Sequence, residues 1–271
     1  MKSKRIALID GDTVIYEAGR AAEEIVQWSE EVVSWYADLK KAEARFVELV
    51  TNIVEGMNAD RFLIALSDYD RPNWRLDILP TYKRQRNQTA LKRRPLAWGH
   101  LRQFCATTFE TFVRPTLEGD DVLGILMTHP SIIKEKEKVC VSIDKDMQTI
   151  PGLHSNFTRN GNDFGWEVKE VTTEYAARFH MVQTLTGDKT DGYVGCPGVG
   201  EVTAQKCLDG VPVDSLWPAV VAQYEKKGLT EADALVQARV ARICQHTEYD
   251  FTNKRVIPWN PPQNCRLNSR P

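Results

Sequence analysis

Short apolar runs alternate with longer helical patterns along the first half of the chain, and this alternation constrains the fold most. The runs with the length and composition of buried strands are Arg5–Ile9, Arg61–Leu66, Thr111–Arg114 and Lys138–Ile143. The helical patterns between them are Ala37–Gly56, Leu96–Phe109 and Asp120–Thr128. Strands that alternate with helices usually form a parallel sheet covered on both faces. The sequence therefore predicts an α/β core with a parallel sheet and helices on both of its faces.

The pattern changes after residue 150. Residues Phe157–Val171 alternate around Asn160–Asp163, which predicts a β-hairpin. Helical patterns follow at Thr173–Leu185 and from Glu201, and another begins after Thr230, whose spacing to Asp233 suits an N-cap. A short apolar piece, Arg255–Trp259, precedes a tail rich in Pro and Asn. We expect a core at residues 1–180 and a helical extension at residues 181–271.

Carboxylates follow each predicted strand, directly or within a few residues. Asp10 follows the first strand, Asp68 the second and Asp144 the fourth, and an acidic segment, Glu118–Asp121, follows the third. One Asp at a strand end is commonly a helix N-cap, but that explanation is poor for all four strands. The carboxyl ends of parallel strands meet at one edge of the sheet. We therefore expect the following carboxylates to converge: Asp10, Asp12, Asp68, Glu118, Asp120, Asp121, Asp144, Asp146, Asp188 and Asp191.

Such a cluster requires cations. Two carboxylates about 4 Å apart repel by roughly 4 kcal/mol at an effective dielectric constant of about 20. Without cations the cluster would destabilise the fold or hold protons. Oxygen ligands select Mg²⁺ or Mn²⁺, and two such ions can stabilise the attacking and leaving oxygens of a phosphoryl transfer. Zinc is not indicated, because the six cysteines are scattered and lack a Cys-x-x-Cys pair.

The positive charge is concentrated in one tract. The net charge is −2, yet no acidic residue lies between Asp77 and Glu110. The cations of this tract are Lys83, Arg84, Arg86, Lys92, Arg93, Arg94 and Arg102. A solvated charged face normally mixes both signs, so the segregation favours a surface for a polyanion. Within the tract, Lys83 and its neighbours could neutralise charge on a phosphate, and Tyr82 offers a ring on which an unpaired base could stack.

A glycine-rich turn, Gly195–Gly200, runs into the helix predicted from Glu201. Glycines let the backbone approach a phosphate, and the helix N-terminus supplies free N–H groups. An ordinary loop is the alternative. The position of the turn directly after Gly187–Gly192, which contains Asp188 and Asp191, favours the functional interpretation.

No apolar run reaches the roughly 18–20 residues that span a bilayer. The apolar stretch after Arg5 is too short for the core of a signal peptide. These features predict a cytoplasmic protein that does not bind membranes.

Taken in order, these motifs resemble the 5′-nuclease family, which includes flap endonucleases and the 5′-exonuclease domains of bacterial DNA polymerases. The resemblance is greatest to the 5′→3′ exonucleases of short-tailed coliphages. The matching segments are Leu8–Asp12, Asn73–Arg75 after Asp68, Tyr82–Arg86, Leu117–Val122, Asp144–Asp146, Gly187–Tyr193, Ala241–Ile243 and Glu248–Phe251. Together they span nearly the whole chain, so the ordered set is specific.

The resemblance implies a PIN-like core, a basic arch or clamp at about residues 78–110, and a helix–hairpin–helix-type duplex-binding element around Gly195–Gly200. It implies a first Mg²⁺ on Asp10, Asp68, Glu118, Asp120 and Asp121, and a second on Asp144, Asp146, Asp188 and Asp191, with Mn²⁺ as a substitute. Lys83 and Arg86 would contact the scissile phosphate. The residues expected to bind DNA are Tyr82, Arg84, Lys92, Arg93, Arg94, Gly195, Gly198 and Gly200. A monovalent cation is a further expectation at the helix–hairpin–helix element.

The activity that the resemblance implies is metal-dependent 5′→3′ exonuclease and 5′ flap endonuclease cleavage of DNA by two metal ions. The substrate would be a duplex with a 5′ end, overhang or flap, or an RNA–DNA hybrid. The implied setting is phage DNA replication in the host cytoplasm, in primer removal and DNA degradation. The role of Asp12 stays open, because many relatives carry a non-acidic residue there. The turn Gly195–Gly200 also departs somewhat from the phage pattern.

Two other functions fit parts of the sequence. In a haloacid-dehalogenase-type phosphatase, Asp10 would be the phosphorylated nucleophile and Asp12 the acid/base. That alternative gives no role to Glu118–Asp121, to Asp144 with Asp146, or to the basic tract. A non-catalytic nucleic-acid-binding protein is the third possibility, and the intact carboxylate set argues against it.

Overall fold

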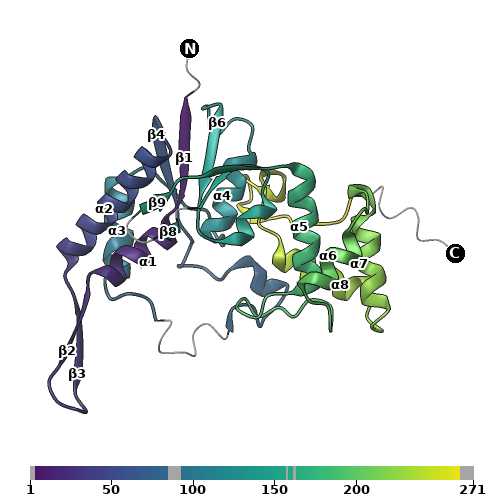
Figure 1. The fold of residues 1–271 in the computed structure, drawn as a ribbon, viewed down its shortest axis with the longest axis horizontal. Helices are drawn as coiled ribbons and strands as arrows, with labels where there is room; N and C mark the ends of the chain where they lie inside the picture. The colour runs from purple at the N-terminus through teal and green to yellow at the C-terminus, as the bar shows by residue number, and fades with distance from the viewer. Residues whose placement is uncertain (1–3, 85–92, 157, 161–162, 263–271) are drawn as a thin grey trace.

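The computed structural model describes residues 4–84, 93–156, 158–160 and 163–262, and its centre is a six-stranded sheet (Figure 1). The strand order is β10 (Val168–Val171), β7 (Gly152–Ser155), β6 (Glu137–Val141), β1 (Arg5–Asp10), β4 (Arg61–Ala65) and β5 (Thr111–Phe112). All neighbours pair in parallel except β10 with β7. The four predicted strands are therefore confirmed as neighbours in a mostly parallel sheet.

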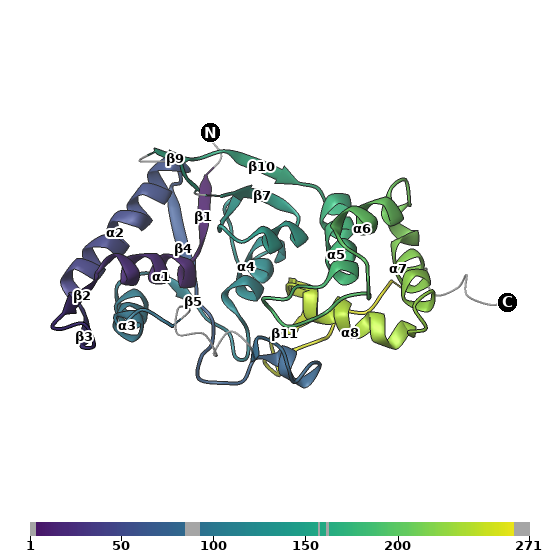
Figure 2. The same cartoon turned by 60° about the horizontal axis from the view of Figure 1, so that its bottom comes forward.

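Helices cover both faces of this sheet, as predicted (Figure 2). Alternate residues of β1 point to opposite sides, so Ala7 and Ile9 join one core while Ile6 and Leu8 join the other. The first face carries α1 (Gly11–Ala21), α2 (Leu39–Gly56) and α3 (Trp98–Thr108), and the second carries α4 (Gly119–Thr128). Every parallel strand thus directs its carboxyl end toward the same edge.

The helical extension has its own hydrophobic core. It contains α5 (Thr173–Thr186), α6 (Glu201–Leu208), α7 (Leu216–Glu225) and α8 (Glu231–Ala241), at the right of Figure 1. Thr230 is the N-cap that the sequence predicted for α8, and together with Asp233 it forms a capping box. The sequence did not predict α7, and the expected boundary at residue 180 falls inside the continuous helix α5.

Short strands complete the fold. On either side of the turn predicted at Asn160–Asp163, β8 (Thr158–Asn160) and β9 (Asp163–Gly165) pair in antiparallel fashion. The rest of the expected hairpin, β10, instead pairs with β7. The last strands, β11 (Tyr249–Asp250) and β12 (Arg255–Val256), pair with each other. Among the described residues no helix is long and apolar enough to cross a membrane.

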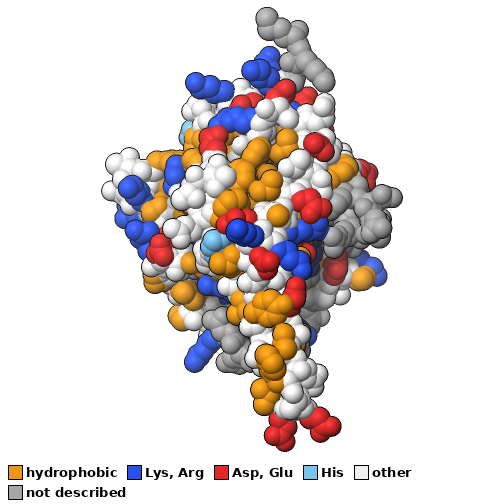
Figure 3. Space-filling model, turned by 90° about the vertical axis from the view of Figure 1, so that its left-hand side faces the viewer, with side chains coloured by type: hydrophobic (Ala, Val, Ile, Leu, Met, Phe, Trp, Pro, Cys, Tyr) orange, Lys and Arg blue, Asp and Glu red, His pale blue; other side chains and the backbone are white. Residues whose placement is uncertain are grey.

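A projecting hairpin, β2 (Glu23–Gln27) and β3 (Val33–Ala37), was not predicted from the sequence. It leaves the core between α1 and α2 and extends away from the sheet (Figure 1). Hydrophobic side chains lie along it and acidic ones at its tip (Figure 3). Trp28 is 70% exposed. Because the hairpin buries so little surface, its apolar residues show none of the burial-driven pattern by which strands are recognised in a sequence.

Candidate active site at the carboxyl edge of the sheet

Asp10 lies at the centre of the carboxyl edge, where β1 ends and α1 begins. It caps α1, accepting hydrogen bonds from the Thr13 amide at 3.1 Å and the Thr13 hydroxyl at 2.6 Å. The Ser142 hydroxyl, just past β6, donates to the same carboxylate at 2.9 Å. Burial raises the pKa of Asp10, and the charge of Asp144 adds to the effect. The neighbouring strands β1 and β6 thus bring Asp10 and Asp144 together, as predicted.

Asp120 joins them from the first turn of α4. Burial raises the pKa of Asp120 well above its ordinary value, and the charges of Asp10 and Asp144 raise it further. Three carboxylates from different strand ends therefore repel one another across this edge.

A second set of carboxylates lies on the side of the helical extension. Asp144 caps the 3₁₀ helix η4 (Lys145–Thr149), and Asp146 accepts a hydrogen bond from Gln183 of α5 at 2.6 Å. Burial and the charges of Asp144 and Asp191 raise the pKa of Asp146 to about 7. Asp188 lies close enough to contribute to the same shift, while its own side chain accepts the amide of Asp191 at 3.2 Å. The structure thus brings together the four carboxylates predicted for a second metal.

Lys83 reaches this edge from the basic tract. Its Nζ lies 2.5 Å from Glu118 Oε1 and 3.6 Å from Asp191 Oδ2. Its backbone has a φ of 54°, in the left-handed region, and its amide donates to the Asp191 carbonyl at 2.7 Å. Burial opposes ionisation of Glu118, but the charges of Lys83 and Arg75 prevail and lower its pKa to about 2. Lys83 therefore lies between the two carboxylate sets.

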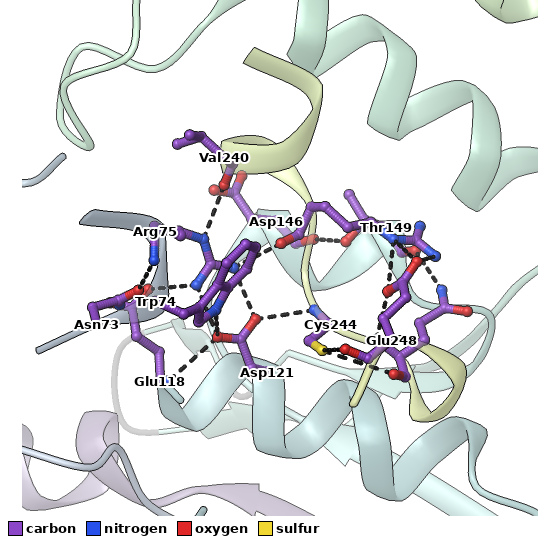
Figure 4. A network of polar contacts seen from close by, with 12 residues as sticks. Asn73, Trp74, Arg75, Glu118, Asp121, Asp146, Thr149, Val240, Cys244 and Glu248 are labelled. Carbon is purple, nitrogen blue, oxygen red and sulfur yellow. Dashed lines mark hydrogen bonds and ion pairs between the residues drawn. The ribbon is translucent and has the colours of Figure 1, made fainter. Parts of the chain in front are cut away.

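Asp121, predicted as a metal ligand, is instead part of a buried ion pair (Figure 4). Both of its oxygens accept hydrogen bonds from Arg75, each at 2.8 Å. Trp74 Nε1 and the Cys244 amide donate to it as well, each at 3.0 Å. The side chain is fully buried. Asp121 lies one helical turn past Glu118, but its side chain points into the protein interior, whereas Glu118 lines the cleft.

Asp68, the other strand-end residue predicted as a ligand, is occupied by its own loop. Its Oδ2 accepts the Thr116 amide at 2.9 Å and the Arg71 guanidinium at 3.1 Å. Burial opposes ionisation, but these bonds prevail and lower the pKa of Asp68. The structure therefore gives Asp68 a loop-forming role that its position after β4 did not reveal.

The donor chemistry of the edge fits hard divalent cations, because every candidate ligand is a carboxylate. Among the residues that the structure describes, no three His, Cys, Asp or Glu side chains stand at the separations of an assembled metal site. The raised pKa values of Asp10, Asp120 and Asp146 are consistent with an edge that a cation would stabilise.

A cleft of about 1360 Å³ opens beside the acidic edge. Its basic lining residues are Arg71, Lys83, Arg84, Arg93 and Arg94. Arg84 is exposed, as a phosphate-binding residue requires, whereas Arg93 forms an ion pair with Glu23 at 2.8 Å. Arg94 packs over the ring of Tyr69 at 4.1 Å. Arg86 and Lys92 lie outside the described residues, and the sequence analysis did not identify Arg71 or Tyr69 as cleft residues.

Tyr82 does not offer the stacking surface that the sequence predicted. The side chain is only 6% exposed. Its hydroxyl donates to Glu118 at 2.9 Å, with Asp191 at 3.2 Å. The residue therefore organises the acidic edge from inside the protein. Its ring packs in a small apolar cluster of its own, with Tyr193 and Val240.

The glycine-rich turn divides into two parts. Gly195 is buried, its φ is 66°, and a Cβ there would lie 2.3 Å from the Gly187 amide nitrogen. Its own amide donates to Gln237 at 2.9 Å, so Gly195 serves packing and not phosphate contact. Gly198 and Gly200 are exposed, and Gly200 caps the N-terminus of α6. The backbone amides of Gly198 and Gly200 are therefore accessible to a phosphate, which is the contact that the sequence predicts for them.

A mostly parallel sheet whose acidic carboxyl edge adjoins an arginine-lined cleft suits an enzyme that binds divalent cations and a polyanionic substrate. Residues 5–176 match the family described as the 5′-3′ exonuclease, N-terminal resolvase-like domain. The chain belongs to this family. Membership decides against the phosphatase alternative, in which Asp10 would be a nucleophile.

Phage proteins are similar to the chain over most of its length. It is 30% identical to an exonuclease of Escherichia phage T7 and 29% identical to an exodeoxyribonuclease of Enterobacteria phage T3. Each alignment covers 95% of this chain, with 94% of the T7 protein and 93% of the T3 protein.

The fold is similar to solved structures of the bacteriophage T5 enzyme. One is a 5′-exonuclease with divalent zinc ions bound, with a TM-score of 0.56, and another is a flap endonuclease complex with DNA and metal ions, with a TM-score of 0.55. Both are 16% identical and cover 88% of this chain and 93% of theirs. At this identity the likeness establishes the fold.

Proposed function

We propose that the chain hydrolyses DNA phosphodiester bonds from a 5′ end and at 5′ flaps, with two divalent cations at the acidic edge of a PIN-like core. The observation that carries the proposal is the position of Lys83. Its ammonium group lies between Glu118 and Asp191, while the same residue lines the arginine-rich cleft. A phosphate entering the cleft thus meets a cation at the boundary of the carboxylate cluster.

The carboxylates fall into two sets that would hold the cations. Asp10, Glu118 and Asp120 would hold the first, and the second would lie with Asp144, Asp146, Asp188 and Asp191. We propose Mg²⁺, with Mn²⁺ as a substitute, because the donors are all oxygens. Bound there, the two ions would supply charge stabilisation for the attacking and leaving oxygens. The T5 structures, which were solved with bound metal ions, support divalent cations in general.

The chain's own residues would position the DNA. Lys83 would contact the scissile phosphate together with Arg86, while Arg84 and Arg94 would contact phosphates further along the cleft. Gly198 and Gly200 would present backbone amides to a duplex in a helix–hairpin–helix-type element, with a monovalent cation bound there. The proposed substrates are DNA duplexes and RNA–DNA hybrids with a 5′ end, overhang or flap. The proposed setting is phage replication in the host cytoplasm, in primer removal and DNA degradation.

The test is a digestion series on duplexes labelled at either end, with and without a 5′ flap, in Mg²⁺ and in excess EDTA. We expect products from the 5′ end in Mg²⁺ only, and no turnover of p-nitrophenyl phosphate. Asp120→Asn should slow cleavage by at least about 10²-fold while DNA binding persists. Glu55→Gln, which alters an exposed carboxylate on α2, is the matched control. Full activity in EDTA, or less than a tenfold loss in Asp120→Asn, would refute the proposal.

A further inference from the structure

Asp12 lies two residues after Asp10 but belongs to a different set of contacts. Its Oδ2 accepts the Ser67 amide at 3.0 Å and also the Ser67 hydroxyl. Its Oδ1 accepts Arg102 Nη1 at 3.0 Å. The carboxylate is therefore occupied by protein donors from two other elements: the segment after β4, and α3.

The Ser67 hydroxyl carries the connection onward. While it donates to Asp12, it accepts the Gly119 amide at 2.8 Å. Gly119 opens α4 between Glu118 and Asp120. The fit is close, because a Cβ on Gly119 would lie 3.2 Å from Asp12 Oδ2. A continuous hydrogen-bond chain thus joins the N-terminus of α1, which follows Asp10, to the N-terminus of α4.

Arg102 closes the arrangement from α3. Besides Asp12, it donates to the Ser67 carbonyl through Nη2 at 2.7 Å, so one guanidinium binds both partners. The Tyr69 ring lies 4.7 Å from Arg102 and 4.1 Å from Arg94 of the cleft. Arg102 is the last cation of the basic tract, and it contacts the scaffold of the acidic edge rather than the open cleft.

We propose that Asp12, Ser67 and Arg102 form a positioning unit that fixes the distance between Asp10 and the Glu118–Asp120 segment. The proposal rests on the proposed metal-dependent nuclease function. Asp10 and Asp120 repel each other, and nothing covalent links α1 to α4 at this edge. The hydrogen-bond chain through Ser67 holds the two helix starts together against this repulsion. Catalytic groups must be held to within about 0.5 Å of productive geometry, and residues behind the ligands supply that restraint.

The variants are Asp12→Asn, Ser67→Ala, Arg102→Met and the double variant Asp12→Asn with Arg102→Met. Loss of a residue that orients ligands typically costs about 10–100-fold in metal affinity or activity. We expect kcat to fall by about that factor and the Mg²⁺ concentration for half-maximal rate to rise, while KM for DNA changes less than about threefold. The double variant should be no worse than the more severe single variant, because the residues act as one unit. Arg45→Met, at the α2 ion pair with Glu48, is the matched control.

Single-turnover cleavage of a 5′-overhang duplex over a Mg²⁺ series, at a temperature where every variant is folded, distinguishes the outcomes. If all variants match Arg45→Met, the positioning unit is refuted. If Asp12→Asn loses as much activity as Asp120→Asn while Ser67→Ala and Arg102→Met are unaffected, Asp12 is itself a ligand and the inference is wrong. If the losses of kcat in the double variant are additive and the Mg²⁺ dependence is unchanged, the residues act separately and the positioning unit is likewise refuted. An inactive wild-type protein would instead refute the proposed nuclease function.

Discussion

Replacing Arg75 with methionine tests how much one buried guanidinium contributes to stability. Arg75 is buried beneath the acidic edge and forms a two-pronged ion pair with Asp121 (Figure 4). Its Nε donates to the Val240 carbonyl at 2.9 Å, and Nη2 donates to the Arg242 carbonyl at 2.7 Å. One guanidinium therefore joins the start of α4 to the end of α8 in the helical extension. Methionine keeps most of the volume and removes every donor.

The expected loss follows from what the substitution leaves behind. Asp121 would remain fully buried and charged, with only the donors of Trp74, Cys244 and its own helix start. Removing one partner of a buried ion pair costs about 3–5 kcal/mol. Since a protein of this kind is stable by about 5–15 kcal/mol, Arg75→Met should lose a large fraction of its free energy of unfolding. The melting temperature should fall by roughly 10 °C.

Equilibrium unfolding in urea measures this loss, with Arg45→Met as the matched arginine substitution. In the Arg45–Glu48 pair of α2 the Glu48 side chain is exposed and Arg45 is half-buried, so its removal should cost about 1 kcal/mol. Adding Asp121→Asn to Arg75→Met removes the stranded charge and should restore at least about 1 kcal/mol. The reasoning fails if Arg75→Met costs less than about 1 kcal/mol, or if the double variant is less stable than the single one.

Three further predictions concern metal, catalysis and pH. Mg²⁺ should raise the melting temperature over EDTA, because a cation relieves the repulsion around Asp120; an unchanged thermal scan would contradict this. Lys83→Ala should lower kcat by about 10²–10³-fold, or about 2.7–4 kcal/mol, whereas Arg94→Ala should mainly weaken binding measured in Ca²⁺; a pure affinity effect of Lys83→Ala would refute its catalytic role. Burial lowers the pKa of His180 to about 3, so stability should be complete above about pH 6.5 and decline as pH falls toward 3, by roughly 3 kcal/mol at pH 4. The urea midpoint of His180→Gln should therefore change less between pH 6.5 and 4 than that of wild type. An equal change of midpoint with pH in both proteins would contradict this.

The acidic edge was predictable because it depends on short-range rules. Buried strands are recognisable as apolar runs, and alternation with helices makes them parallel. Once the strands are parallel, Asp10, Asp120 and Asp144 lie at the same edge of the sheet, and the order β6-β1-β4-β5 with α4 packed beside β1 brings them close. The basic surface followed from a tract without acidic residues, and the family resemblance distinguished Lys83 within it. In the structure, Asp10, Asp120 and Asp144 lie close enough for their charges to interact, although they are far apart in the sequence.

The roles of Asp121 and Tyr82 were not predictable because they depend on partners far away in the sequence, and Asp68 combines a distant partner, the Thr116 amide, with its neighbour Arg71. Asp121 faces Arg75, which is itself held by carbonyls of α8 and the residue after it. A carboxylate one turn into a helix and a carboxylate at its start look alike in the sequence. Only the packed interior distinguishes them. The β2–β3 hairpin was missed for the opposite reason, since it contacts little of the core and its exposed Trp28 follows no pattern of burial.

The carboxylates of the edge divide according to the cations that the chain already provides. Glu118 lies beside Lys83 and Arg75, and its pKa is lowered to about 2. The pKa of Asp120, two residues later, is raised well above its ordinary value by burial and by Asp10 and Asp144. Lys83 and Arg75 thus stabilise the negative charge of Glu118 at the start of α4. The negative charge of Asp120, on the other side of that start, remains unfavourable. An added divalent ion gains most where charge is costly, so we expect bound metal to affect stability and catalysis most at Asp10 and Asp120.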